Sequence, residues 1–191
     1  MSSARIAMLD SQQVSRSCDG SSQPELMKSQ IQTIRTTIRS LLEQCDVPYR
    51  VAPYDHELHQ ECTDEAIRRG YPVEGDHSVC TFLRVGVVYA ATAGRHHGRP
   101  TQIWIALYTA CVIYVDEIPV RFPSEIPDIH RFTDRFFGRE QQGNAVLDTL
   151  ADIIRQAPNL FRPIPSKLIM TSSLNFFTAN LLEYETGSME V

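Results

Sequence analysis

The strongest chemical feature of the sequence is the adjacent acid pair Asp116 and Glu117, which directly follows an uncharged run from Ile103 to Val115. A run of this length is too short to span a bilayer and is typical of a helix buried in a soluble core. Two carboxylates at the end of such a helix repel each other and resist ionisation unless a positive charge meets them. We therefore expect an Arg or Lys from elsewhere in the fold, bulk water at a cavity mouth, or a divalent metal ion beside the pair.

One face of this buried helix leads to Asp116 without a charge for about three turns. Each residue of an α-helix turns the chain by about 100°, so the uncharged residues within about 60° of Asp116 are Ile105, Thr109, Val112 and Ile113. An apolar cavity with a metal ion at its mouth needs this pattern. The simpler interpretation is an ordinary helix end, where two acids meet solvent or an arginine.

The elements that position the acid pair are predicted to be helices. Residues 1–23 are rich in Ser, Gln and Gly, and we expect a disordered leader there. Apolar residues at helical spacing predict an amphipathic helix from Pro24 to Cys45, followed by helices over residues 55–69 and 77–93. Residues 24–191 are expected to form one domain, or part of a larger one.

The chain after Glu117 is expected to leave the helix, because three prolines follow within ten residues. A new helix is predicted near residues 124–137, and a short amphipathic one over residues 146–154. A proline-rich connection, residues 158–165, then leads to a last helix over residues 166–185. About seven helices with short connections, and no segment that alternates as a strand, predict an all-α fold.

Bulk composition narrows the classes of partner. The net charge of −5, without a basic cluster, argues against nucleic acid and anionic membranes. The five cysteines are odd in number and scattered, which suits reduced thiols in the cytoplasm. The N-terminus lacks the apolar core of a signal peptide, and no membrane span is expected. The sequence leaves a homodimer open.

The order of three segments resembles a known family. A buried helix that ends in an acid pair is followed by FGREQ at Phe137–Gln141 and by SSLNFFTANLLEYE at Ser172–Glu185. This order resembles the trichodiene synthase family of fungal sesquiterpene cyclases, which are class I terpene synthases. The resemblance covers roughly residues 71–185, and it implies the class I terpenoid synthase helical fold and a role in isoprenoid secondary metabolism.

The resemblance also implies a substrate, a cofactor and a site. The substrate is a prenyl diphosphate such as farnesyl diphosphate, and Mg²⁺ neutralises the departing pyrophosphate. Asp116 and Glu117 are implied as the metal ligands, and aromatic faces in a water-free wall stabilise the carbocation. Phe176, Phe177 and Asn180 are candidates for that wall, although aromatic residues at helical spacing are more often simply core. No catalytic acid or base is assigned.

The chain departs from the family pattern in two places. The acidic motif of the family usually reads DDxxD, whereas this chain has Asp116, Glu117 and then no acid at Val120. The second metal motif, NDxxSxxxE, and the basic diphosphate sensors should lie downstream, so the resemblance implies a chain truncated before the C-terminal helices. Two interpretations follow: a terpene cyclase, or a non-catalytic helical pseudoenzyme or interaction module. A chain-elongating prenyltransferase fits less well, because it needs a full DDxxD.

Overall fold

The computed structural model describes residues 22–46 and 53–187, and within these ranges every regular element is helical. The all-α fold class is therefore confirmed. Two short 3-10 helices, η1 and η2, separate some of the α-helices. The elements are α1 Ser22–Gln44, α2 His56–Arg69, η1 Val79–Thr81, α3 Leu83–Thr92, α4 Arg99–Arg121, η2 Pro123–Glu125, α5 Ile126–Gly138, α6 Ala145–Leu160 and α7 Pro163–Gly187.

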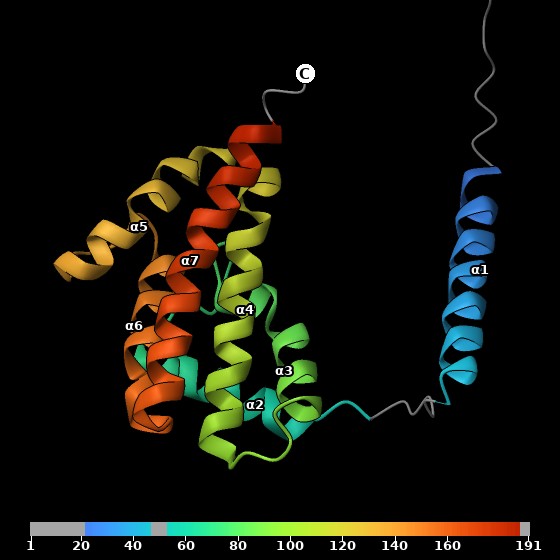
Figure 1. The fold of residues 1–191 in the computed structure, drawn as a ribbon, viewed down its shortest axis with the longest axis horizontal. Helices are drawn as coiled ribbons and strands as arrows, with labels where there is room; N and C mark the ends of the chain where they lie inside the picture. The colour runs from blue at the N-terminus through green and yellow to red at the C-terminus, as the bar shows by residue number, and fades with distance from the viewer. Residues whose placement is uncertain (1–21, 47–52, 188–191) are drawn as a thin grey trace, which may run out of the picture. The chain divides into compact units, whose positions relative to one another are not determined.

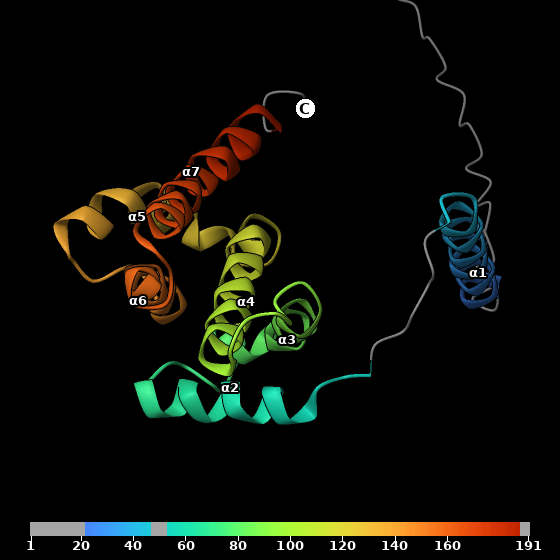
Figure 2. The same ribbon diagram turned by 60° about the horizontal axis from the view of Figure 1, so that its bottom comes forward.

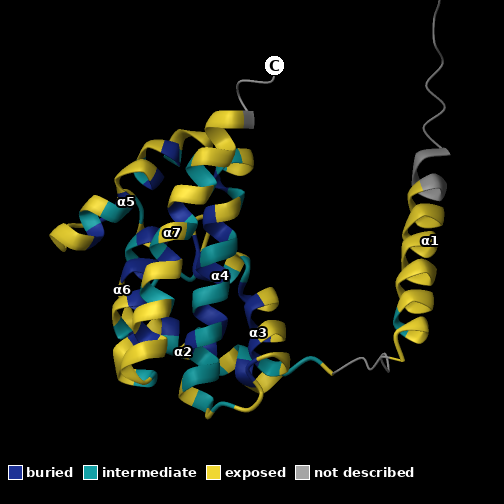
Figure 3. Cartoon of the chain, viewed as in Figure 1, coloured by how far each residue is buried: buried dark blue, intermediate teal, exposed yellow. Residues whose placement is uncertain are grey.

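The chain divides into two compact units, residues 1–51 and 52–191, and the expected single domain over residues 24–191 stays a prediction. The first unit contains α1, and Figure 3 shows its described surface as mostly exposed. Large apolar side chains lie at helical spacing and stay more than a third exposed in α1: Met27, Ile31, Ile34, Ile38 and Leu41. Of the expected disordered leader, residues 1–21 lie outside the described part of the chain, and Ser22 already begins α1.

The second unit is built around α4. This helix packs against α2, α3 and α6, and α7 packs against α5 and α6. Figure 1 shows α4 between α3 on one side and α6 with α7 on the other, and Figure 2 shows α2 crossing the ends of α3 and α4. The uncharged run of α4 provides the middle of the core, where Ala106, Cys111, Tyr114 and Val115 are fully buried. The expected buried helix is therefore confirmed, and it is longer than predicted.

The tightest packing in this unit lies between α3 and α4. A Cβ atom on Gly86 would stand only 2.1 Å from the carbonyl oxygen of Ala106, so a side chain at this position cannot be accommodated without a shift. The lack of a side chain lets the two backbones approach closely. By length and composition α4 could cross a membrane, but its flanks are covered by neighbouring helices, which is the usual state of a core helix.

Local sequence explains where several helices begin and end. Asp55 caps α2 by accepting a hydrogen bond from the backbone N–H of Leu58 at 2.8 Å, and Asn144 caps α6 in the same way. Gly70 ends α2 in the left-handed conformation, with φ of 73°. The helix expected over residues 77–93 is divided into η1 and α3.

Two prolines that were expected to break the chain lie inside helices. Pro119 is within α4 and Pro158 is within α6, so the loop predicted after Glu117 and the connection predicted from residue 158 are both wrong. Each proline removes one backbone hydrogen bond in a terminal turn. The neighbouring residues Ile118 and Ala157 are fully buried, and their carbonyls still accept bonds from the residues that end each helix. Core packing therefore outweighs the lost hydrogen bond.

Candidate functional site

The acid pair lies near the C-terminal end of α4, and its two carboxylates have different surroundings. Asp116 is exposed, and it lines a cavity of about 240 Å³. Glu117 is half-buried and forms an ion pair with Arg121, whose Nε lies 2.7 Å from Glu117 Oε2. Because α4 continues to Arg121, Glu117 finds its positive charge one helical turn further along. The expectation that a cation meets the pair is thus met for Glu117 by an arginine.

The cavity beside Asp116 is formed by the last turns of α4 and by α7. Its walls come from Asp116, Pro119 and Val120 on α4 and from Asn180, Glu183 and Tyr184 on α7. The structure therefore brings together Asp116 and Asn180, which are separated by 64 positions in the sequence but were both predicted as site residues. Glu183 adds a second carboxylate that was not among the predicted site residues.

Asn180 uses one of its two amide hydrogens within α7 and keeps its side-chain oxygen as an acceptor. Its amide nitrogen donates to the carbonyl of Phe176 at 3.1 Å, one helical turn earlier. The side-chain oxygen of Asn180 is then the remaining acceptor. The cavity wall thus offers carboxylate oxygens from Asp116 and Glu183 and an amide oxygen from Asn180, which is a set of hard oxygen donors. Among residues 22–46 and 53–187, no group of three or more His, Cys, Asp or Glu side chains is close enough to hold a metal ion.

A polar contact fixes α7 against α4. Tyr108 Oη and Ser173 Oγ lie 2.8 Å apart. Both helices run in the same direction in Figure 1, and residues further along each of them line one cavity. This register places Asn180 beside Asp116.

The predicted apolar wall is partly core. Ile105, Thr109, Val112 and Ile113 are half-buried on α4, and none of them lines the cavity beside Asp116. Phe177 is fully buried, and its ring stacks on Phe132 of α5 with centroids 3.7 Å apart.

Phe176, by contrast, is half-buried and meets Phe177 edge to face. Phe177 therefore joins α5 to α7, whereas Phe176 keeps an accessible face.

The FGREQ segment ends α5. Gly138 is its last residue, and Arg139 follows with φ of 55°, a left-handed conformation that terminates the helix. Residues 138–141 are exposed, whereas the next residue, Gln142, is buried. Both side-chain polar atoms of Gln142 lack a hydrogen-bond partner within the described chain. The sequence did not predict this buried amide.

A polar cluster holds the C-terminal half of α4, and sequence reasoning missed it. Tyr114 on α4 is fully buried and donates to Glu125 of η2 at 3.0 Å. His77 Nδ1 lies 2.7 Å from the tyrosine oxygen and 2.9 Å from Glu125, and Asn144 donates to Glu125 at 2.7 Å. Burial first, and then the Glu125 carboxylate, raise the pKa of Tyr114, so its hydroxyl remains a donor. Three segments are thereby tied to the helix that bears Asp116: the loop before η1 through His77, η2 through Glu125, and the start of α6 through Asn144.

Comparison with known proteins shows that the chain is similar to fungal terpene synthases. It is 33% identical over 161 residues to the alpha-cuprenene synthase of Coprinopsis cinerea, an alignment that covers 83% of this chain and 49% of that protein. It is 28% identical over 134 residues to the longiborneol synthase of Gibberella zeae, covering 70% and 39%. It is also 28% identical over 141 residues to terpene synthase BipA of Cochliobolus sativus, covering 72% and 42%.

These similarities confirm the predicted resemblance to fungal terpene synthases. The chain spans about half the length, or less, of the curated relatives it matches. No protein-family model matches it. The finer assignment to the trichodiene synthase family stays a prediction, as do the cytoplasmic location and the homodimer.

Proposed function

We propose that this chain provides the first acidic wall of a class I terpene cyclase that acts on a prenyl diphosphate such as farnesyl diphosphate. The observation that carries the proposal is the cavity in which Asp116 meets Asn180 and Glu183. Its support is the similarity to fungal terpene synthases over 83% of the chain. The whole enzyme's reaction would break the allylic C–O bond and leave the electron pair on pyrophosphate.

The residues of the cavity fit a Mg²⁺ ion in part. Mg²⁺ takes oxygen ligands from one or two carboxylates together with phosphate and water, and Asp116, Glu183 and Asn180 offer such oxygens. Glu117 is a weaker candidate than its sequence position suggested, because Arg121 already neutralises it. When bound, the ion would neutralise the charge of the departing pyrophosphate.

Residues outside the cavity supply uncharged and aromatic surface and hold the helix that carries Asp116. The half-buried face of Ile105, Val112 and Ile113 is uncharged, as a wall next to a carbocation must be. Phe176 has an accessible aromatic face, which can stabilise positive charge. The Tyr114–Glu125 hydrogen bond fixes the turn of α4 that carries the acid.

A second candidate function is a non-catalytic helical interaction module derived from the same fold. The Glu117–Arg121 ion pair favours it, because a carboxylate committed to arginine is less available to a metal ion. So does the lack of any three-residue acidic or histidine cluster in the described chain.

The experiment that separates the two functions measures protection against unfolding. Mg²⁺ together with inorganic diphosphate should raise the melting temperature by more than the sum of the two shifts that each gives alone, because each supplies charge that the other needs. Asp116→Asn should abolish this joint protection. Asp134→Asn, which removes an exposed acid on α5, is the matched control and should retain it. Equal joint protection in both variants would show that the assignment of Asp116 to the metal ion is wrong, whereas no joint protection in the unaltered chain would favour the non-catalytic function.

A further inference from the structure

A second cavity lies on the opposite side of α4 from Asp116. Its volume is about 330 Å³, it is partly open to solvent, and it is lined by α2, α4, α6 and the segment that follows α2. Leu107 lines it and lies nine residues before Asp116, which places the two about 180° apart around the helix. The cavity is therefore separate from the proposed diphosphate site.

The apolar half of this cavity comes mainly from α4. Trp104, Ile103 and Leu107 form one wall, and Ile153 and Leu160 of α6 meet them. The indole is held in place, because its Nε1 donates to the carbonyl of Ile153 at 2.8 Å and its ring stacks on Tyr108. A fixed aromatic wall of this kind accepts a flat apolar group.

In the polar half of the cavity, Tyr71 and Gln156 use their donor hydrogens within this pair and on Asp152. Tyr71 donates to Asp152, and burial followed by that carboxylate raises the pKa of Tyr71, so the phenol keeps its proton. The side-chain nitrogen of Gln156 donates to Tyr71 Oη at 3.0 Å and to Asp152 at 2.7 Å. With both amide hydrogens used, Gln156 can offer a ligand only its carbonyl oxygen.

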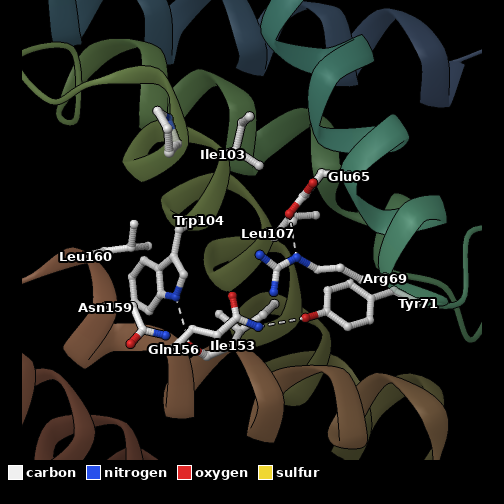
Figure 4. A pocket seen from close by; sticks show the side chains of 11 residues that line it. Glu65, Arg69, Tyr71, Ile103, Trp104, Leu107, Ile153, Gln156, Asn159 and Leu160 are labelled. Carbon is white, nitrogen blue, oxygen red and sulfur yellow. Dashed lines mark hydrogen bonds and ion pairs between the residues drawn. The ribbon is translucent and has the colours of Figure 1, made fainter.

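Arg69 supplies hydrogen-bond donors, whereas Gln156 supplies an acceptor. Its Nε bonds Glu65 at 2.5 Å, and Figure 4 shows its guanidinium group pointing toward the centre of the lining residues. Glu65 and Arg69 are the charged residues of the lining, and they pair with each other. The lining itself therefore carries no net charge, and an ionised ligand would have to compete with Glu65 for Arg69.

We propose that this cavity is a second binding site, which takes an uncharged molecule consisting of an apolar ring and a carboxamide. The ring lies against Trp104. The carboxamide oxygen accepts from Arg69, and its N–H group donates to Gln156. The volume is at the small end of the range for ligand sites, which limits the ligand to one ring and a short chain.

The single tryptophan of the chain makes this proposal directly measurable, because Trp104 is itself a wall of the cavity. We would titrate the full 191-residue chain with 3-phenylpropanamide and follow tryptophan emission, excited where the phenyl ring does not absorb. The expected result is a saturable change in emission and a rise in melting temperature. The matched probes are 3-phenylpropanoate, which carries a charge, and propylbenzene, which has no polar group; both should bind at least about tenfold more weakly.

Two neighbouring arginines that pair with the same glutamate provide a test variant and its matched control. Arg68 and Arg69 both bond Glu65, but only Arg69 lines the cavity. Arg69→Gln should weaken 3-phenylpropanamide binding about tenfold, whereas Arg68→Gln should leave it unchanged. Ile103→Phe should fill the cavity and abolish binding while circular dichroism shows a folded chain. Tighter binding of the carboxylate, equal binding of propylbenzene, or no saturable change with any probe would each overturn the proposal.

Discussion

Tyr108 donates its hydroxyl hydrogen to Ser173, and this bond aligns α4 with α7. The direction follows from the serine, whose single hydroxyl hydrogen is already donated to the carbonyl of Ile169 at 2.7 Å. From this contact to Asp116 is a rise of about 12 Å along α4, and from Ser173 to Asn180 about 10 Å along α7. The two side chains therefore reach the same level, which is why they line one cavity.

We expect Tyr108→Phe and Ser173→Ala to destabilise the fold by different amounts. Tyr108→Phe removes a donor and leaves the serine bonded to Ile169, so the free energy of unfolding should fall by only about 1 kcal/mol. Ser173→Ala leaves the mostly buried tyrosine hydroxyl without its acceptor and should cost about 1–3 kcal/mol. Urea titration checks both values. A smaller cost for Ser173→Ala than for Tyr108→Phe would contradict the assigned donor.

A second pair of variants tests which acid completes the candidate site. Glu183→Gln should reduce the joint protection by Mg²⁺ and diphosphate, because Glu183 lines the cavity with Asp116. Glu117→Gln should retain most of it, since Glu117 is already paired with Arg121. Thermal melts with both additives present provide the measurement. The reverse order of effects would restore the adjacent pair as the metal ligands.

Gly86→Ala should be strongly destabilising. The added methyl group would meet the backbone oxygen of Ala106 at 2.1 Å, and the backbone of α4 cannot yield as a flexible side chain would. Overpacking of this kind costs about 1–3 kcal/mol or more. Gly98→Ala is the control, because its nearest neighbouring atom is 4.0 Å away. Similar urea midpoints for the two variants would show that α3 and α4 can separate without loss.

Above about pH 9, the free energy of unfolding should depend on the ionisation of buried thiols. Burial raises the pKa of Cys62 from its ordinary value of 9.0 to about 12. Between these values the unfolded chain loses the thiol proton and the folded chain keeps it, so the free energy of unfolding falls as pH rises from about 9 to 12.

Cys62→Ala should make this fall less steep, which urea titrations at several pH values would show. In native buffer, iodoacetamide should modify the exposed Cys45 well before the buried Cys62 and Cys111. Equal rates at the three cysteines in native buffer would refute the assigned protection.

With farnesyl diphosphate and Mg²⁺, the chain as it stands should release little or no cyclic hydrocarbon. Ionisation needs the pyrophosphate charge neutralised by preorganised groups, and loss of one such group costs about 10²–10³ in rate. The cavity beside Asp116 offers two carboxylates and an amide, and the described chain contains no larger acidic cluster. Gas chromatography of the extracted products is the measurement. Abundant terpene that disappears in Asp116→Ala would show that these few ligands suffice.

Local chemistry made much of the helical framework predictable. The cap at Asp55, the left-handed end at Gly70 and the amphipathic pattern of α6 each depend on residues that are neighbours in the chain. The prolines misled the prediction, because Pro119 and Pro158 were judged without the buried residues beside them. The Glu117–Arg121 pair was hidden for the same reason: it exists only if α4 continues past Pro119.

The sequence by itself determined that the chain is helical, that an uncharged helix forms its core, and that Asp116 lies at the end of an uncharged face. Periodicity and charge are local properties, and they are sufficient for these conclusions. Only the tertiary structure decided which groups meet that acid. Asn180 and Glu183 line the same cavity as Asp116 because α7, which packs on α5 and α6, meets α4 at the Tyr108–Ser173 contact, and Phe177 is core because its ring stacks on Phe132 of α5. Register between helices depends on side chains that are distant in the chain, and no local pattern specifies it.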